Sequence, residues 1–193
     1  MANVDKAFGL RPYKGLNVGS AVQEANKYNI NTSGYGTSIF QGDLTIFNGG
    51  YIERAAASSA NLVGVFSHVF YTATDGTPTF KNYYPASTTA LGSGDIEAYI
   101  YDDPNQLFVV QADGSSGQTA IGRNADTDGI GGSTTTGVST RELDSSSLAT
   151  TAALQLKVVG VVQDEVNGDL TADNANLVVL INEHAYKGAV AGT

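Results

Sequence analysis

The chain has 193 residues, enough for one domain with long loops, and its lack of cysteine excludes disulfides, thiolate metal sites and thiol catalysis. Its net charge of −9 disfavours nucleic acid as a partner, because an acidic surface repels phosphate backbones. No apolar run approaches the roughly 18 residues of a membrane span, and the N-terminus lacks the apolar core of a signal peptide, so we expect a soluble, unprocessed chain without a membrane partner.

Residues 1–19 are predicted to form an extended N-terminal arm. They show no sustained period of either helix or strand, and apolar side chains are spaced among glycine and basic residues. The first 30 residues carry four basic and two acidic side chains on an otherwise acidic protein. We expect the arm to dock on a neighbouring acidic surface, adding a strand to a sheet edge, and we expect the body to fold without residues 2–16. The candidate contact residues are Phe8, Leu10, Arg11, Pro12, Tyr13 and Lys14.

The body, residues 20–187, is predicted to be all-β. Glycine is frequent, tyrosine outnumbers phenylalanine by 10 to 7, and short apolar segments alternate with turn residues such as Asn48-Gly49-Gly50. These features favour a β-sandwich, jelly-roll-like or β-tulip body with less than about a tenth of its residues in helix, against about a third in an average domain. We expect core strands at 61–73, 96–101, 107–112, 154–162 and 177–182, with further strands at 22–30, 43–47, 51–54 and 79–84.

Two acidic residues and two histidines are the candidates for catalysis. Asp102 and Asp103 precede Pro104 between two predicted strands, where a polar turn is a more probable role than an acid–base pair, since catalytic pairs normally converge from separate elements. His68 lies in mid-strand among aromatic residues, and His184 lies at the end of the last strand. No Gly-x-Ser-x-Gly elbow is present, so we expect no catalytic residues and no enzyme activity.

Residues 115–140 consist mostly of small polar residues and are predicted to form a long surface insertion. Within them, residues 124–129 match the opening of a calcium loop, but the twelfth position is Thr135 where a bidentate glutamate is required. A plain polar loop is the preferred interpretation, and we expect no metal and no cofactor. A short helix is possible at 148–153, and 188–193 is predicted to be a tail of small residues.

Several landmarks together resemble small virion structural proteins of tailed bacteriophages that decorate or cement the capsid shell. They are the opening residues 1–12, the Gly64 segment leading to Tyr71 and Asp75-Gly76, the 99–104 turn with Phe108 and Gln111, and the closing residues 180–184. The resemblance implies an all-β homotrimer on the outer capsid surface of the virion, assembled in the host cytoplasm. It also implies that the major capsid protein is the partner, clamped against internal DNA pressure. From the basic and apolar side chains of the arm, we expect its six candidate residues to contact the capsid or a neighbouring subunit.

Other functions remain open from the sequence. A neck, tail or minor head protein of the virion would share the same pattern. A carbohydrate-binding β-sandwich would use Tyr83, Tyr84, Tyr99 or Tyr101 as a stacking platform, unless these rings pack within the sheet or at a subunit contact. A hydrolase is the least favoured class, because its nucleophile and histidine cluster are missing.

Overall fold

The chain folds almost entirely into antiparallel β-structure. The computed structural model describes residues 3–16, 24–31, 35–163 and 165–187. Strands account for 45% of the residues and helix for 5%, which confirms the all-β prediction and is consistent with a β-sandwich body. The helical residues lie in three single 3₁₀ turns, η1 (Leu91–Ser93), η2 (Gln118–Ala120) and η3 (Ser145–Ser147). No helix in the described ranges is long and apolar enough to cross a membrane.

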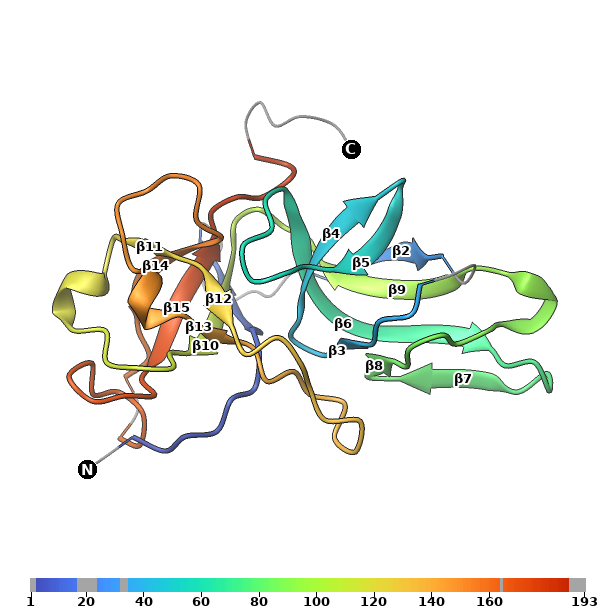
Figure 1. Ribbon diagram of the computed structural model, residues 1–193, viewed down its shortest axis with the longest axis horizontal. Coiled ribbons are helices and arrows are strands. Elements are labelled where there is room, and N and C mark those ends of the chain that lie inside the picture. Colours follow the sequence, from blue (N-terminus) through green and yellow to red (C-terminus); the bar gives the residue numbers. More distant parts are fainter. Residues whose placement is uncertain (1–2, 17–23, 32–34, 164, 188–193) are drawn as a thin grey trace.

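One sheet, here sheet A, brings together the N-terminal segment and the C-terminal half of the chain. Two of its inner strands carry apolar side chains on both faces, and one of these faces packs in the core. Figure 1 shows this sheet on the left, with the N-terminal segment running along it. Its strand order is β1 (Arg11–Gly15), β10 (Gln106–Gln111), β15 (Asn176–Ile181), β14 (Leu156–Val161) and β11 (Asn124–Ala125).

The second sheet, sheet B, is built from the segment between β1 and β10 and lies beside sheet A along the long axis of the molecule (Figure 1). Its longest strand bends at two irregularities in register, one beside Gly64 and one between Phe66 and His68. A Cβ at Gly64 would lie 2.2 Å from the carbonyl oxygen of Tyr101, so the close backbone approach predicted at this glycine is confirmed. Its strands are β2 (Asn26–Ile30), β9 (Ile96–Tyr101), β6 (Leu62–Thr72), β4 (Leu44–Asn48) and β5 (Tyr51–Arg54), with β7 (Pro78–Lys81) paired to β6.

Two short strand pairs complete the fold. β3 (Ile39–Phe40) pairs with β8 (Tyr83–Tyr84) next to sheet B, and β12 (Thr127–Asp128) pairs with β13 (Glu142–Leu143) next to sheet A. The parallel bridges of Gln41 with Val138 and of Ala112 with Leu143 connect these pairs to the rest of the molecule.

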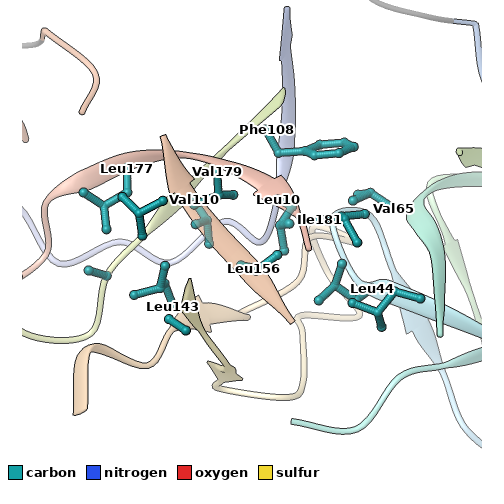
Figure 2. Close-up of a cluster of buried hydrophobic side chains, with 14 of the residues drawn as sticks. Leu10, Leu44, Val65, Phe108, Val110, Leu143, Leu156, Leu177, Val179 and Ile181 are labelled. Carbon is teal, nitrogen blue, oxygen red and sulfur yellow. The ribbon is translucent and has the colours of Figure 1, made fainter. Parts of the chain in front are cut away.

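The core consists of two clusters, and β6 contributes to both. Leu62 and Val65 point into the cluster of sheet A, whereas Val63 and Phe66 point into the cluster of sheet B. Figure 2 shows Val65 and Leu44 beside Ile181 of sheet A. Each fully buried aliphatic or aromatic side chain contributes roughly 1.5–3 kcal/mol relative to exposure. The shared strand thus joins the two sheets into one packed body.

The five predicted core strands are all present, within two residues of their predicted ends. The helix considered at 148–153 does not form; Ala149 makes an antiparallel bridge to Asn124, and the other residues are in turns and irregular backbone. The part of the predicted strand at 22–30 that precedes residue 24, and the predicted tail at 188–193, lie outside the described residues.

The prediction for residues 115–140 is wrong in one respect. The segment is polar, yet Ala120, Ala125 and Thr127 are buried, and β11 forms the edge of sheet A. Burial is possible because the polar groups find partners: Thr127 donates from both its backbone nitrogen and its hydroxyl to Gln155 Oε1, at 3.2 and 2.7 Å. Most of the segment is accessible, but its buried residues and β11 tie it into the folded body.

Candidate functional site

The described part of the N-terminal arm lies on its own body. Leu10 donates from its backbone nitrogen to Gly42 O at 2.9 Å, and the Lys6 nitrogen donates to Gln111 Oε1 at 2.8 Å. Gly9 has a φ of +68°, and a Cβ there would lie 2.8 Å from Gly42 O, so this close crossing requires glycine. The arm then pairs as β1 with β10, from Arg11 opposite Val109. Strand addition to a sheet edge occurs as predicted, but the edge belongs to the same chain.

Leu10 is a core residue and not an exposed contact of the kind predicted. Its side chain is 1% exposed and packs in the core cluster of sheet A, so it offers almost no surface of its own to a partner. Deleting residues 2–16 would remove an edge strand and a core side chain, which argues against the expectation that the body folds without them. The sequence favoured a separate arm because a five-residue strand with a proline and two basic residues has no clear alternation of its own.

The other five candidate residues, Phe8, Arg11, Pro12, Tyr13 and Lys14, are at least partly accessible, and four of them form two cation–aromatic pairs. The guanidinium carbon of Arg11 lies 4.2 Å from the centroid of the Phe8 ring. The Nζ atom of Lys14 lies 5.3 Å from the centroid of the Tyr13 ring, and Tyr13 is 43% exposed. Such stacking orients a cation while leaving its N–H groups available for hydrogen bonds.

The register of sheet A places these cations on its outer face, away from the core. Opposite residues on antiparallel strands share a face. Lys14 opposes Leu107, which opposes Leu180, which opposes Lys157 on β14. The neighbouring row of side chains on the same outer face runs from Arg11 through Val109 to Val178. We call this surface the basic face; it comprises Lys6, Phe8, Arg11, Tyr13, Lys14, Val109, Lys157, Val159 and Val178.

The basic face carries exposed apolar side chains and unpaired cations together. Val159 is 38% exposed, and the Tyr13 ring is 43% exposed. Neither Arg11, Lys14 nor Lys157 forms an ion pair with a carboxylate in the part of the chain that the structure describes. Two hollows open on this face, one of about 260 Å³ beside Phe8 and Arg11 and one of about 190 Å³ beside Tyr13 and Lys14.

A third hollow lies where the β1 edge of sheet A meets sheet B, and we call it the interlobe hollow. It measures about 310 Å³, its floor is apolar, and the exposed side chains of Arg11 and Gln41 lie at its rim. Phe8 and Arg11 line both this hollow and the larger hollow of the basic face. The interlobe hollow is lined by Phe8, Leu10, Arg11, Pro12, Gln41, Phe66, Tyr101 and Val138.

The Asp102–Asp103 pair forms a turn and not a catalytic dyad. Asp102 accepts hydrogen bonds from Asn26 Nδ2 at 2.8 Å and from the hydroxyl of Tyr28, whose pKa is raised by burial and by this carboxylate. Asp103 Oδ1 accepts from the backbone nitrogen of Asn105 at 2.8 Å within the turn. The two carboxylates therefore have separate structural partners, as the turn interpretation predicts.

The two histidines are packing residues in separate places. His68 stacks on the Tyr99 ring at a centroid distance of 4.4 Å, and burial lowers its pKa. His184 is 1% exposed and accepts a hydrogen bond at Nδ1 from the backbone nitrogen of Tyr186 at 3.1 Å. Burial, helped by the nearby charge of Lys187, lowers the pKa of His184 to about 4. Among the residues that the structure describes, neither ring contacts a serine and a carboxylate together in the way a triad requires.

The calcium-like stretch points its oxygens in different directions. Asp126 Oδ1 accepts from the Gln155 nitrogen at 3.1 Å, Asp128 Oδ1 accepts from the Gly129 nitrogen at 2.7 Å, and Asn124 Nδ2 donates to Thr151 O at 2.9 Å. The described residues contain no group of three histidine, cysteine, aspartate or glutamate side chains that could hold a metal. The segment is held by its own hydrogen bonds.

The tyrosines proposed as a sugar platform have covered faces or lie in the interlobe hollow. Tyr84 is fully buried, Tyr83 stacks on Phe40 at 5.7 Å, and Tyr99 stacks on His68. Tyr101 lines the interlobe hollow. A sugar ring needs an open aromatic face, so these four residues do not form a common platform.

Sequence reasoning missed a buried polar cluster around Arg141. Its guanidinium is completely buried and donates to Ala55 O at 2.5 Å and to Thr127 Oγ1 at 2.6 Å, and its Nε lies 3.8 Å from Asp43 Oδ1. Ser139 Oγ also donates to Asp43, at 2.6 Å. Burial raises the pKa of Asp43 and lowers that of Arg141 to about 10. The cluster joins the β4–β5 region to the polar segment, residues 115–140. The spacing of these residues in the sequence gives no sign of the cluster.

Comparisons with known proteins give no relative for this chain. No protein-family model, no curated protein sequence and no solved structure matches it.

Proposed function

We propose that this chain is a structural protein of a tailed-bacteriophage virion that binds the outer capsid surface and stabilises the shell by bridging major capsid proteins. The observation that carries the proposal is the basic face. On a protein of net charge −9, unpaired cations and exposed apolar side chains gather on one sheet surface beside the arm. Such a surface suits an acidic partner that covers its apolar centre.

The chemistry of this surface favours assembly over catalysis. Arginine binds carboxylates in a bidentate manner, and the Arg11 guanidinium is already oriented by the Phe8 ring. Each contact is modest because exposed charges are screened over about 8 Å at physiological salt. Many copies attached to one shell would add weak contacts through avidity.

The test is binding of the purified chain to heads of the phage that encodes it, prepared without this protein. We expect co-sedimentation with these heads and a rise in their resistance to heat. A double variant, Arg11→Gln with Lys14→Gln, should bind roughly tenfold or more weakly, because each lost charged hydrogen bond costs about 1.5–3 kcal/mol. The matched control, Arg123→Gln with Lys81→Gln, removes the same charge elsewhere and should bind as the unaltered chain does.

Salt dependence gives a second readout. Binding should weaken from 50 to 300 mM salt, and less steeply for the Arg11 and Lys14 double variant. Heads that bind the double variant as tightly as the unaltered chain would refute attachment through the basic face. Immunogold labelling confined to the neck or tail of virions would refute the position on the shell.

We further propose that the chain assembles as a homotrimer. At the end of sheet B remote from sheet A, Phe70, Phe80 and Leu91 are 40%, 63% and 53% exposed, and a monomer would leave them in water. Light scattering should give three times the chain mass of 20.0 kDa. A mass of one chain, with and without capsids present, would contradict this.

A further inference from the structure

We propose that the interlobe hollow receives one large apolar side chain of the capsid protein, with a neighbouring carboxylate of that protein bound by Arg11. This inference rests on the proposed function and specifies the chemistry of its partner: an acidic segment that presents an aromatic or long aliphatic residue. The partner would thus be held by one side chain inserted in the hollow, in addition to charge contacts with the basic face.

The hollow has the size and lining for such an anchor. Its volume of about 310 Å³ is at the lower end for sites that enclose a small molecule, so one large side chain can fill much of it. Leu10 and Phe66 form a floor that is at most 1% exposed, while Pro12 and Val138 are half-buried at the sides. An apolar side chain that enters would lose its contact with water on most of its surface.

The rim of the interlobe hollow carries positive charge. The side chain of Arg11 is exposed and stacked on Phe8, and its guanidinium has no hydrogen-bonding or ionic partner within the described ranges. A planar guanidinium fixed by an aromatic ring presents its N–H edge in one direction, which suits a carboxylate. Lys14, the next cation on the same strand, adds to the positive potential.

The walls come from distant parts of the chain, so the hollow exists only in the folded molecule. Phe8 and Pro12 come from the arm, Phe66 from β6 and Val138 from the polar segment, where it bridges to Gln41. Buried, desolvated pockets of this kind are where interface energy concentrates, with large apolar and arginine residues as anchors.

The experiment measures binding to heads with two variants and two matched controls. Val138→Trp fills the hollow without changing charge, and Arg11→Lys keeps the charge but loses the bidentate geometry. Each should weaken binding roughly ten- to hundredfold, the range of an interface hot spot. Thr89→Trp adds the same ring at an exposed position on another part of the surface, and Arg123→Lys makes the same exchange away from the hollow; both should bind normally.

Fluorescence separates local effects from misfolding, because the chain has no native tryptophan. The single tryptophan of Val138→Trp should emit at shorter wavelength than that of Thr89→Trp, and both variants should unfold at the same urea concentration as the unaltered chain. Normal binding by Val138→Trp, with its ring shown to be enclosed, would overturn the proposal.

A small probe keeps this inference distinct from the proposed function. NMR titration with 3-phenylpropionate, an aromatic carboxylate, should shift the methyl signals of Leu10 and Val138 and compete with head binding. If the chain binds no heads at all, the proposed function fails; a hollow that still takes up the probe then belongs to a small ligand and the capsid anchor is refuted. Head binding that the probe does not reduce would also refute it.

Discussion

Replacing Leu10 by alanine tests whether the N-terminal segment is part of the folded body. Leu10 is 1% exposed and packs in the core cluster of sheet A. A buried leucine replaced by alanine costs about 2–5 kcal/mol, from lost transfer free energy plus the cavity that remains. Gly9 and Gly42 fix the backbone on either side of this contact, so we expect little collapse and a loss of about 3 kcal/mol.

The assay is urea unfolding followed by far-ultraviolet circular dichroism. With a slope of about 2 kcal/mol per molar urea, the midpoint should fall by about 1.5 M. Leu16→Ala is the matched control, because it makes the same chemical change six residues along the chain at a side chain that is 47% exposed. It should change the free energy of unfolding by no more than about 0.5 kcal/mol. Equal, small effects of both substitutions would show that the segment is a detachable arm.

Three further predictions concern the interior. Arg141→Met should cost about 3–5 kcal/mol in urea unfolding, because it leaves the buried Asp43 carboxylate without its ionic partner; a change below about 1 kcal/mol would contradict this. The pKa of His184 is lowered from 6.5 to about 4, so the unfolded chain binds a proton that the folded chain excludes; stability should be full above pH 6.5 and fall by up to about 3 kcal/mol toward pH 4. His184→Gln should flatten that slope, and an unchanged slope would refute the assignment. Gly64→Ala should lower the thermal midpoint, because its Cβ would meet Tyr101 O at 2.2 Å, whereas Gly160→Ala, with open space around it, should not.

The strands could be predicted because their signals are local. Ile96, Ala98 and Ile100 alternate along β9, and the apolar run of β15 matches a strand covered on both faces. Turn residues such as Asn48-Gly49-Gly50 mark where the chain reverses, and Gly49 and Gly50 adopt the positive φ that such turns require.

The arrangement of the site could not be predicted in the same way. That Arg11, Tyr13 and Lys14 would be exposed followed from their chemistry, but the burial of Leu10 depends on β10, which lies almost a hundred residues further along the chain. The partial burial of the polar segment at 115–140 could not be predicted for a similar reason. Its small side chains carry no pattern of their own, and partners such as Gln155 become neighbours only after folding.

The order of strands in sheet A has a consequence for synthesis on the ribosome. All of sheet B lies between β1 and β10, so its strands leave the ribosome as one continuous stretch and can pair first. Sheet A cannot form until its central strand, β15, which ends at Ile181, has been synthesised. Until then Leu44 and Val65 lack the core side chains of β15, and β10 has no partner strand on the side away from β1. A nascent chain that stalls after β10 therefore exposes apolar surface that is prone to aggregation. A chaperone that covers this surface should act in that interval.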